Sequence, residues 1–253
     1  MFLSIVCQKG GVGKSTLSVN IADVYSKNGK KVLLIDLDPQ GNSTTYLHNK
    51  EKSTFDSLNL LENKKKIDID QIPEVRENLY LIPSNQEVKR LISSKLVGGS
   101  ILRKRRDGEE FKGFDIVIVD TPPSMSSVVS EAICFSDYYL IPTRAEFLSV
   151  EGVGQAIKFA KESVANRKES NPIFLGVVLN SVDKRRTSFK SFYSELKLIL
   201  GDKLFETAIS QLTEVAEAPF FGRTLSEHNT NGKAHKEVVL LVEEIDRKME
   251  EYI

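Results

Sequence analysis

Short apolar runs alternate along this chain with longer segments in which apolar residues recur at helical spacing. The runs that predict buried strands span residues 2–7, 31–36, 78–83, 114–120, 138–142, 173–180 and 203–209. The segments that predict helices span residues 14–27, 127–135, 151–167, 188–200 and 234–251. Fully apolar strands that alternate with helices are typical of a parallel sheet buried on both sides. The pattern therefore predicts an α/β fold, with a doubly wound, mostly parallel sheet and helices on both faces.

The alternation runs through residues 1–253 without a linker rich in proline, glycine or serine, so we expect a single domain. We expect no helix-turn-helix extension before the first strand. Residues 48–71 are polar and carry no long apolar pattern, and we expect them to wrap around the surface.

Composition narrows the functional classes only slightly. Lysine and arginine total 35, as do aspartate and glutamate, so nucleic-acid binding would require a local basic surface. The two cysteines, Cys7 and Cys134, lack the paired spacing of a zinc module or a disulfide framework. No stretch approaches the ~18 apolar residues of a membrane span, and the first apolar run is too short for a signal peptide. We therefore expect a soluble cytoplasmic protein.

A glycine-rich loop, residues 8–16, joins the first predicted strand to the first predicted helix. Its glycines let successive backbone N–H groups point into one concavity that fits phosphate oxygens, and the following helix adds partial positive charge. Lys14 is expected to reach the β- and γ-phosphates, Ser15 to ligate magnesium and Thr16 to contact the α-phosphate. The predicted nucleotide-binding residues in this segment are Lys9, Gly10, Gly11, Val12, Gly13, Lys14, Ser15 and Thr16.

Acidic residues stand at the ends of two other predicted strands. Asp36 and Asp38 follow one strand, and Asp120 ends another in the manner of a Walker B strand. Carboxylates at the carboxyl ends of parallel strands face the ligand crevice, and magnesium prefers oxygen ligands. Such groups can hold the metal's water shell or orient the attacking water. Either acidic element alone could instead serve only to cap the end of its strand, without binding a ligand.

The loop departs from the ordinary phosphate loop, because Gln8 stands where the first glycine would be and Lys9 adds a second lysine. This form resembles the deviant phosphate loop of the ParA and MinD superfamily. Residues 36–40, Asp-Leu-Asp-Pro-Gln, match the D-x-D-P-Q element of the ParA family in full. The similarity extends to about residue 232, and its compact form is similar to Soj proteins.

This resemblance implies a P-loop ATPase that binds ATP with Mg²⁺ and turns over slowly on its own. It implies that Lys9 reaches across an ATP-dependent homodimer to the partner's nucleotide, and that Asp38 orients the attacking water. The predicted catalytic residues are thus Lys9, Lys14 and Asp38, and the predicted metal residues are Ser15, Asp36 and Asp120. The resemblance also implies that Asn180 contacts adenine, with Ile209 and Gln211 on the other side of the base pocket.

The resemblance further implies nonspecific DNA binding on the nucleoid and a ParB-like centromere-binding partner that speeds hydrolysis. Three basic clusters are candidates for the DNA contacts: residues 64–66, 103–106 and 184–186. Lys184, Arg185 and Arg186 are preferred, because Arg185 aligns with a DNA-binding arginine of the family. A second such arginine corresponds to Glu214 here.

Two other functions remain as alternatives. A MinD-like ATPase would act on a membrane, but the last predicted helix carries Glu243, Glu244, Glu250 and Glu251, which anionic lipid would repel, so we expect no membrane partner. A nucleotide-gated scaffold for some other cargo is compatible with the same motifs. Iron–sulfur carriers and scaffolds of related fold would need cysteine ligands that the chain does not supply.

Overall fold

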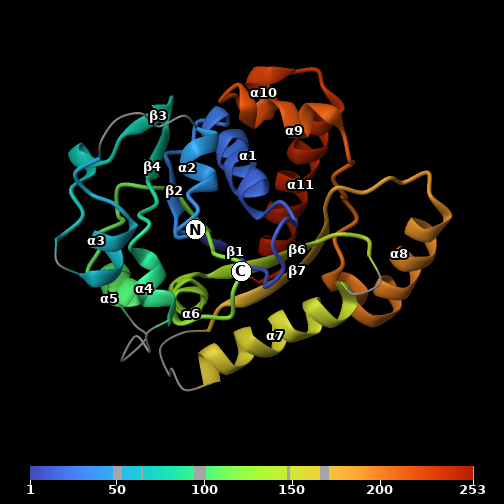
Figure 1. Ribbon diagram of the computed structural model, residues 1–253, viewed down its shortest axis with the longest axis horizontal. Helices are drawn as coiled ribbons and strands as arrows, with labels where there is room; N and C mark the ends of the chain where they lie inside the picture. Colours follow the sequence, from blue (N-terminus) through green and yellow to red (C-terminus); the bar gives the residue numbers. More distant parts are fainter. Residues whose placement is uncertain (48–52, 64, 94–100, 147–148, 166–170, 253) are drawn as a thin grey trace.

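One seven-stranded sheet forms the centre of the computed structural model, which describes residues 1–47, 53–63, 65–93, 101–146, 149–165 and 171–252 (Figure 1). The strand order is β3-β4-β2-β5-β1-β6-β7. The strands are β1 (Phe2–Ile5), β2 (Val32–Asp36), β3 (Glu74–Arg76), β4 (Leu79–Ile82), β5 (Ile116–Asp120), β6 (Tyr138–Thr143) and β7 (Ile173–Leu179). All neighbours pair in parallel except β3, which runs antiparallel to β4 at the edge. The predicted fold class is confirmed.

The helices that cover the sheet vary widely in length. They are α1 (Lys14–Lys27), α2 (Asn42–Tyr46), α3 (Ser57–Glu62), α4 (Val88–Ser93), α5 (Ile101–Asp107), α6 (Ser127–Phe135), α7 (Ser149–Ala165), α8 (Thr187–Leu200), α9 (Thr213–Phe220), α10 (Leu225–His228) and α11 (Lys233–Glu250). Figure 1 shows α6 and α7 on the opposite side of the sheet from α1 and α11.

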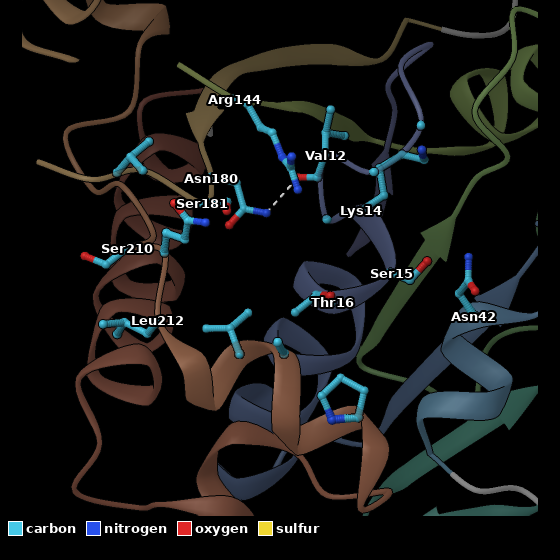
Figure 2. Close-up of a pocket in the computed structure, with 18 of the residues that line it drawn as sticks. Val12, Lys14, Ser15, Thr16, Asn42, Arg144, Asn180, Ser181, Ser210 and Leu212 are labelled. Atoms are coloured by element: carbon cyan, nitrogen blue, oxygen red, sulfur yellow. Dashed lines mark hydrogen bonds between the residues drawn. The ribbon is translucent and has the colours of Figure 1, made fainter. Parts of the chain in front are cut away.

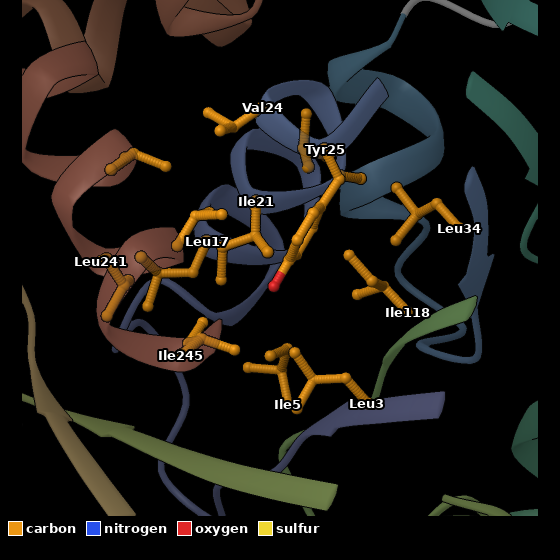
Figure 3. Close-up of a cluster of buried hydrophobic side chains, with 14 of the residues drawn as sticks. Leu3, Ile5, Leu17, Ile21, Val24, Tyr25, Leu34, Ile118, Leu241 and Ile245 are labelled. Carbon is orange, nitrogen blue, oxygen red and sulfur yellow. The ribbon is translucent and has the colours of Figure 1, made fainter. Parts of the chain in front are cut away.

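Alternation along the strands divides the core between the two faces of the sheet. Leu3 and Ile5 of β1 pack with α1 and α11, where Leu17 and Leu241 are among the buried partners (Figure 3). Neighbouring positions on β2 and β5, such as Leu33, face a second cluster that includes residues of α3, α5 and α6. Burial on both sides explains why the central strands β2 and β5 are apolar at every position before their terminal aspartates.

The prediction of a strand over residues 203–209 is wrong. A short 3₁₀ turn (Gly201–Lys203) precedes an extended segment that makes only isolated bridges to its neighbours. The N–H groups of Glu206 and Thr207 donate instead to the Glu244 carboxylate of α11, both at 2.8 Å. The Ser210 N–H donates to Glu237 of the same helix at 2.7 Å. Side chains of α11 thus take the place of a neighbouring strand.

The expectation that residues 48–71 merely wrap the surface is also wrong for the described part of that segment. Phe55, Leu60 and Leu61 are buried in the core on the α6 side of the sheet. Helix α3 is only six residues long, so it offers too few turns for a periodic pattern. Its start is fixed locally by a capping box between Asp56 and Asn59. Residues 48–52 and 64 lie outside the described residues.

The parallel strands deliver the chemically interesting residues to one edge of the sheet. The register sets Ile5 beside Asp120 and Asp36 beside Asp120, so the glycine-rich loop and both carboxylates lie close together. Strands β6 and β7 end at Thr143 and Leu179, which are also paired. Ligand sites in open parallel sheets form at this carboxyl edge.

Candidate nucleotide-binding site

A cavity of about 1240 Å³ lies at the carboxyl edge of the sheet (Figure 2). Residues 10–16 line one part of it, together with Asp38 of the loop after β2. Residues 180–186, after β7, and residues 210–213 line another part. The predicted phosphate loop and one predicted basic cluster therefore share a single cavity.

The glycine-rich loop has the backbone conformation that its sequence predicts. Gly11 and Gly13 have φ values of 74° and 87°, in the left-handed region that favours glycine. Helix α1 starts at Lys14, and no side chain caps its first turn. The early N–H groups of a helix have no partner within it, so this turn can accept an anion. A Cβ at Gly13 would lie 2.1 Å from Nδ2 of Asn180, which leaves no room for another residue.

Asn180 holds the glycine-rich loop from the end of β7. Its Nδ2 donates to the Val12 carbonyl at 2.7 Å, and the residue is only 4% exposed (Figure 2). Gln211 lines the cavity as expected, and Ser210 and Leu212 lie beside it. Ile209 does not, which corrects its assignment to the base pocket. Its side chain is buried in the hydrophobic core, because bonding of its N–H to Leu179 aligns it with β7.

Asp36 and Asp120 are both fully buried and lie on neighbouring strands. Asp36 accepts hydrogen bonds from the Thr44 N–H at 2.9 Å and the Thr44 hydroxyl at 2.8 Å. Burial and the nearby Asp120 carboxylate raise the pKa of Asp36 to about 8. Burial also raises the pKa of Asp120, against smaller opposing effects of the Ser15 and Ser43 hydroxyls. Two desolvated carboxylates on neighbouring strands are therefore costly to ionise in the absence of a cation.

One oxygen of Asp120 is available for a metal or its water shell. Oδ2 accepts the Ser43 hydroxyl at 2.7 Å, whereas Oδ1 is buried without a hydrogen-bond partner in the described structure. This orphaned carboxylate oxygen fits a magnesium site that also includes Ser15. Across the described ranges, no group of three or more His, Cys, Asp or Glu side chains could hold a metal. Magnesium here would share phosphate oxygens and water, as it commonly does.

Asp38 occupies the wall of the cavity beyond the buried pair. It is 4% exposed, and its Oδ1 accepts the Gln40 N–H at 3.0 Å. The Ser84 hydroxyl donates to its backbone carbonyl. The loop thus holds this carboxylate at the cavity, where it can contact a ligand.

Lys9 and Arg144 share one carboxylate at the rim. Lys9 forms an ion pair with Glu146 of its own chain, and both side chains are about half exposed, at 43% and 48%. The hydrogen bond from Lys9 is the main reason that the pKa of Glu146 lies below its usual value. Arg144 lies 3.9 Å from the other oxygen of Glu146 and lines the cavity. Sequence reasoning missed Arg144, although its position immediately after a β-strand could have marked it.

The basic clusters differ in their surroundings. Arg185 and Arg186 pair with Asp183 at 2.9 Å and 3.6 Å, and hydrogen bonds from Arg185 hold the pKa of Asp183 at about 2. Lys184 pairs with Glu237 at 3.3 Å. All three basic residues of this cluster line the cavity.

The cluster at residues 103–106 is largely structural, which makes it a weaker candidate for a DNA surface than residues 184–186. Arg105 is 2% exposed and pairs with Glu110 at 2.6 Å. The Arg106 guanidinium lies 4.1 Å from the centre of the Phe2 ring and donates to a backbone carbonyl. Of the third cluster, Lys64 lies outside the described residues.

Glu214, which stands where the family has an arginine, supports the fold. Its Oε1 accepts the Ala234 N–H at 2.7 Å in the first turn of α11. Its Oε2 accepts the side chain of Asn229 at 3.3 Å. A carboxylate at the start of a helix is favourable, so a glutamate suits this position better than an arginine would.

The last helix packs against the sheet. Leu241 and Ile245 of α11 are buried in the core, and Glu244 is bonded to backbone N–H groups. None of the helices in the described ranges is both long and apolar enough to cross a membrane.

Comparison with known proteins places the chain in a family. A protein-family profile described as an AAA domain matches residues 1–173. The chromosome-partitioning ATPase Soj of Thermus thermophilus is 29% identical over 252 residues, covering 98% of this chain and 96% of that protein. The sporulation initiation inhibitor protein Soj of Bacillus subtilis is 29% identical, covering 96% and 97%.

Solved structures agree with the sequence matches. A plasmid partition protein of Borrelia burgdorferi, solved with AMPPNP bound, has a TM-score of 0.78 and 27% identity, and the match covers 100% of this chain and 99% of that one. The sequence matches and the structural match each cover nearly the whole of this chain. The chain therefore belongs to the ParA/Soj family of AAA-domain ATPases.

Proposed function

We propose that this ATPase partitions DNA, with Mg-ATP driving a homodimer that binds DNA without sequence preference. A ParB-like centromere-binding protein would accelerate hydrolysis and release the dimer from DNA. The observation that carries the proposal is the position of Arg185 and Arg186 at the cavity that also contains the phosphate loop. A nucleotide bound in this cavity would therefore lie near two arginines whose positive charges can bind DNA phosphates. We expect the protein to act on the nucleoid in the cytoplasm.

The phosphate end of the cavity supports the proposed roles in ATP binding. Lys14 and the N–H groups at the start of α1 would hold the phosphates. Ser15 and the free oxygen of Asp120 would hold Mg²⁺ or its water shell, with Asp36 beside them. When bound, the metal neutralises charge on the phosphate oxygens.

Hydrolysis would depend on positioning rather than on covalent chemistry. Asp38 would orient a water molecule towards the terminal phosphorus from the cavity wall. The water oxygen bonds to that phosphorus, the bond to the ADP oxygen breaks, and the two water protons leave with the phosphate product as dihydrogen phosphate, which can release one of them to solvent. Asn180, which braces the loop through Val12, would keep the phosphate-binding N–H groups in place and present its amide towards the base.

Lys9 would change partners on dimerisation. In this structure it pairs with Glu146 of its own chain, on a half-exposed surface where an ion pair contributes little. Release of this contact therefore costs about 1 kcal/mol or less, which a nucleotide phosphate of a partner chain could readily offset.

The test is binding of the purified protein to nonspecific duplex DNA with ATP, ADP or no nucleotide, at two salt concentrations. We expect binding only with ATP, weakening at higher salt as counterion release requires. Lys9→Gln should still bind ATP but lose both the dimer, seen by size exclusion, and DNA binding.

Absence of DNA binding while the ATP dimer forms would contradict the proposed role. That result would favour the alternative of a switch that positions another cargo or acts on a membrane. An unchanged dimer in Lys9→Gln would show instead that Lys9 has no role across the interface.

A further inference from the structure

We propose that Arg144 is a phosphate-binding residue that acts in cis, stabilising charge on the nucleotide phosphates during hydrolysis. Its guanidinium would add to the positive charge that Lys14 and the start of α1 supply. The inference rests on ATP hydrolysis and not on DNA binding.

The fold places Arg144 on the same edge of the sheet as the phosphate loop. Strand β6 pairs with β1 in parallel, and the Val6 N–H donates to the Leu140 carbonyl at 3.0 Å. Beyond the Ile5–Leu140 pair, β1 leads into the glycine-rich loop, and β6 continues to Thr143, directly before Arg144. Figure 2 shows the side chain of Arg144 extending towards Val12 and Asn180, above the loop that precedes Lys14. Arg144 also lines the cavity together with residues 10–16.

The guanidinium of Arg144 is only weakly engaged by protein carboxylates. In the described structure its ion-pair partner is Glu146, at 3.9 Å, close to the limit for such a contact. Glu146 is engaged mainly by Lys9 through its other carboxylate oxygen. A partner with several negative oxygens would therefore meet little competition for Arg144.

The other arginines that line the cavity are held more closely. Arg185 donates to both oxygens of Asp183, at 2.9 Å and 3.0 Å, and Arg186 lies 3.6 Å from the same group. Their side chains are 90% and 72% exposed, whereas that of Arg144 is 44% exposed. Partial burial reduces screening, so a phosphate contact made by Arg144 would be the stronger one.

Arginine has the right chemistry for this role. Its planar fork can donate two parallel hydrogen bonds to phosphate oxygens, and it stays protonated at all physiological pH values. In phosphoryl transfer, an arginine supplied in cis or in trans can raise turnover by about 10³–10⁵-fold. Arg144 would exchange no proton in the reaction. It would lower the energy of the charge that develops while the bond from the terminal phosphorus to ADP breaks.

The test compares Arg144→Gln and Arg144→Lys with Arg223→Gln, which removes an exposed arginine outside the cavity lining. Steady-state hydrolysis and the affinities for ATP, ADP and AMP would be measured without DNA or partner protein. For Arg144→Gln we expect kcat/KM to fall about 100-fold, the scale for loss of one charge-stabilising donor. Affinity for ATP and ADP should fall about tenfold more than affinity for AMP, since a lost charged contact is worth roughly 1.4 kcal/mol or more.

Arg144→Lys should lower kcat/KM and nucleotide affinity less than Arg144→Gln does, because lysine retains the positive charge although it lacks the planar guanidinium. It also provides the decisive variant if Arg144→Gln fails to fold. The binding measurement should then be repeated with Arg144→Gln combined with Lys9→Gln, which we expect to be monomeric. The same loss of nucleotide affinity in the monomer would show that Arg144 contacts the nucleotide of its own chain.

Wild-type turnover in a folded Arg144→Gln would overturn the proposal, as would equal losses of ATP and AMP affinity, which a structural role would produce. If Arg144→Gln no longer lowered nucleotide affinity in the Lys9→Gln background, the assignment of Arg144 to the nucleotide of its own chain would be wrong. None of these results depends on whether the protein binds DNA.

Discussion

The two ends of the nucleotide cavity are built in different ways. At the phosphate end, the glycine-rich loop and the carboxylates come from short segments that directly follow buried strands. At the opposite end, contacts join distant parts of the chain, such as Lys184 and Ser210 with Glu237 of α11. The first end is fixed by strand register, whereas the second is held by side chains.

The charges at these ends are also balanced differently. The phosphate end contains two buried carboxylates on neighbouring strands, one of which has an oxygen without a hydrogen-bond partner in the described structure, so a cation would relieve an existing cost. At the other end, Arg185, Arg186 and Lys184 already have carboxylate partners. We infer that the phosphate end is prepared for its ligand, and that the basic end must exchange partners before it can bind a polyanion.

The largest effect is expected from Asp120→Asn at the phosphate end. Loss of the metal-binding carboxylate should lower Mg-dependent hydrolysis by about 10³-fold, since a metal stabilises charge by several kcal/mol. Without nucleotide, the thermal midpoint should stay the same or rise, because one of two adjacent buried carboxylates is removed. Hydrolysis assays and thermal unfolding test both expectations. Wild-type hydrolysis would rule out the metal role.

Asp38→Ala should separate binding from turnover at the same end. Hydrolysis should fall about 100-fold, the usual scale for loss of a group that positions or activates water. ATP affinity should change little, because Lys14 and the start of α1 remain. The ATP-bound dimer should then accumulate, as measured by size exclusion with ATP and Mg²⁺. A variant that hydrolyses ATP at the wild-type rate would contradict the assignment.

A smaller effect is expected at the basic end from Arg185→Gln. Loss of one phosphate contact should weaken DNA binding several-fold and reduce the salt slope by about one. Arg103→Gln is the matched control, because Arg103 pairs with Asp107 in the cluster that is largely structural. DNA titrations with ATP at several salt concentrations would measure both. Equal effects in the two variants would show that only overall charge matters.

A still smaller functional effect is expected from Glu237→Ala, which removes the carboxylate that joins Lys184 to Ser210 at the basic end. The Ser210 N–H and hydroxyl would lose their acceptor, at a cost of about 1–3 kcal/mol in the free energy of unfolding. ATP affinity should fall only a few-fold, since the phosphate end stays intact. Glu243→Ala, at an exposed position of the same helix, is the control. Denaturant unfolding that shows equal stability in both variants would refute this role for Glu237.

The same contrast explains what the sequence can and cannot predict. The glycine-rich loop, Asp36 and Asp120 were predictable, because a strand end and the residues after it are local in sequence. Helix α1 was also predicted with its observed bounds. The structure brings these residues together at one edge of the sheet, and their roles in nucleotide binding and catalysis remain predictions.

Features that depend on distant partners were not predictable in this way. The apolar character of residues 203–209 suggested a strand, but the N–H groups of Glu206 and Thr207 pair with the Glu244 side chain, and that of the following Ser210 pairs with Glu237, both far along the chain. Arg105 lies in a run of basic residues, a pattern that predicts a solvent-exposed surface. Only the structure shows that it is buried and paired with Glu110. Arg144 belongs to no recognised motif, and its position shortly after a predicted strand was the only sequence signal.

The pairing of an extended segment with two glutamates of α11 also bears on how related sequences can drift. In a sheet, both partners contribute backbone groups, so neither strand depends on one particular side chain for its hydrogen bonds. Here the acceptors are side-chain carboxylates of α11. The hydrogen bonds therefore require particular residues in the helix but not in the extended segment, which contributes only backbone N–H groups. Substitutions at Glu206 and Thr207 should therefore be tolerated among close relatives, whereas replacements of Glu237 and Glu244 should be rare.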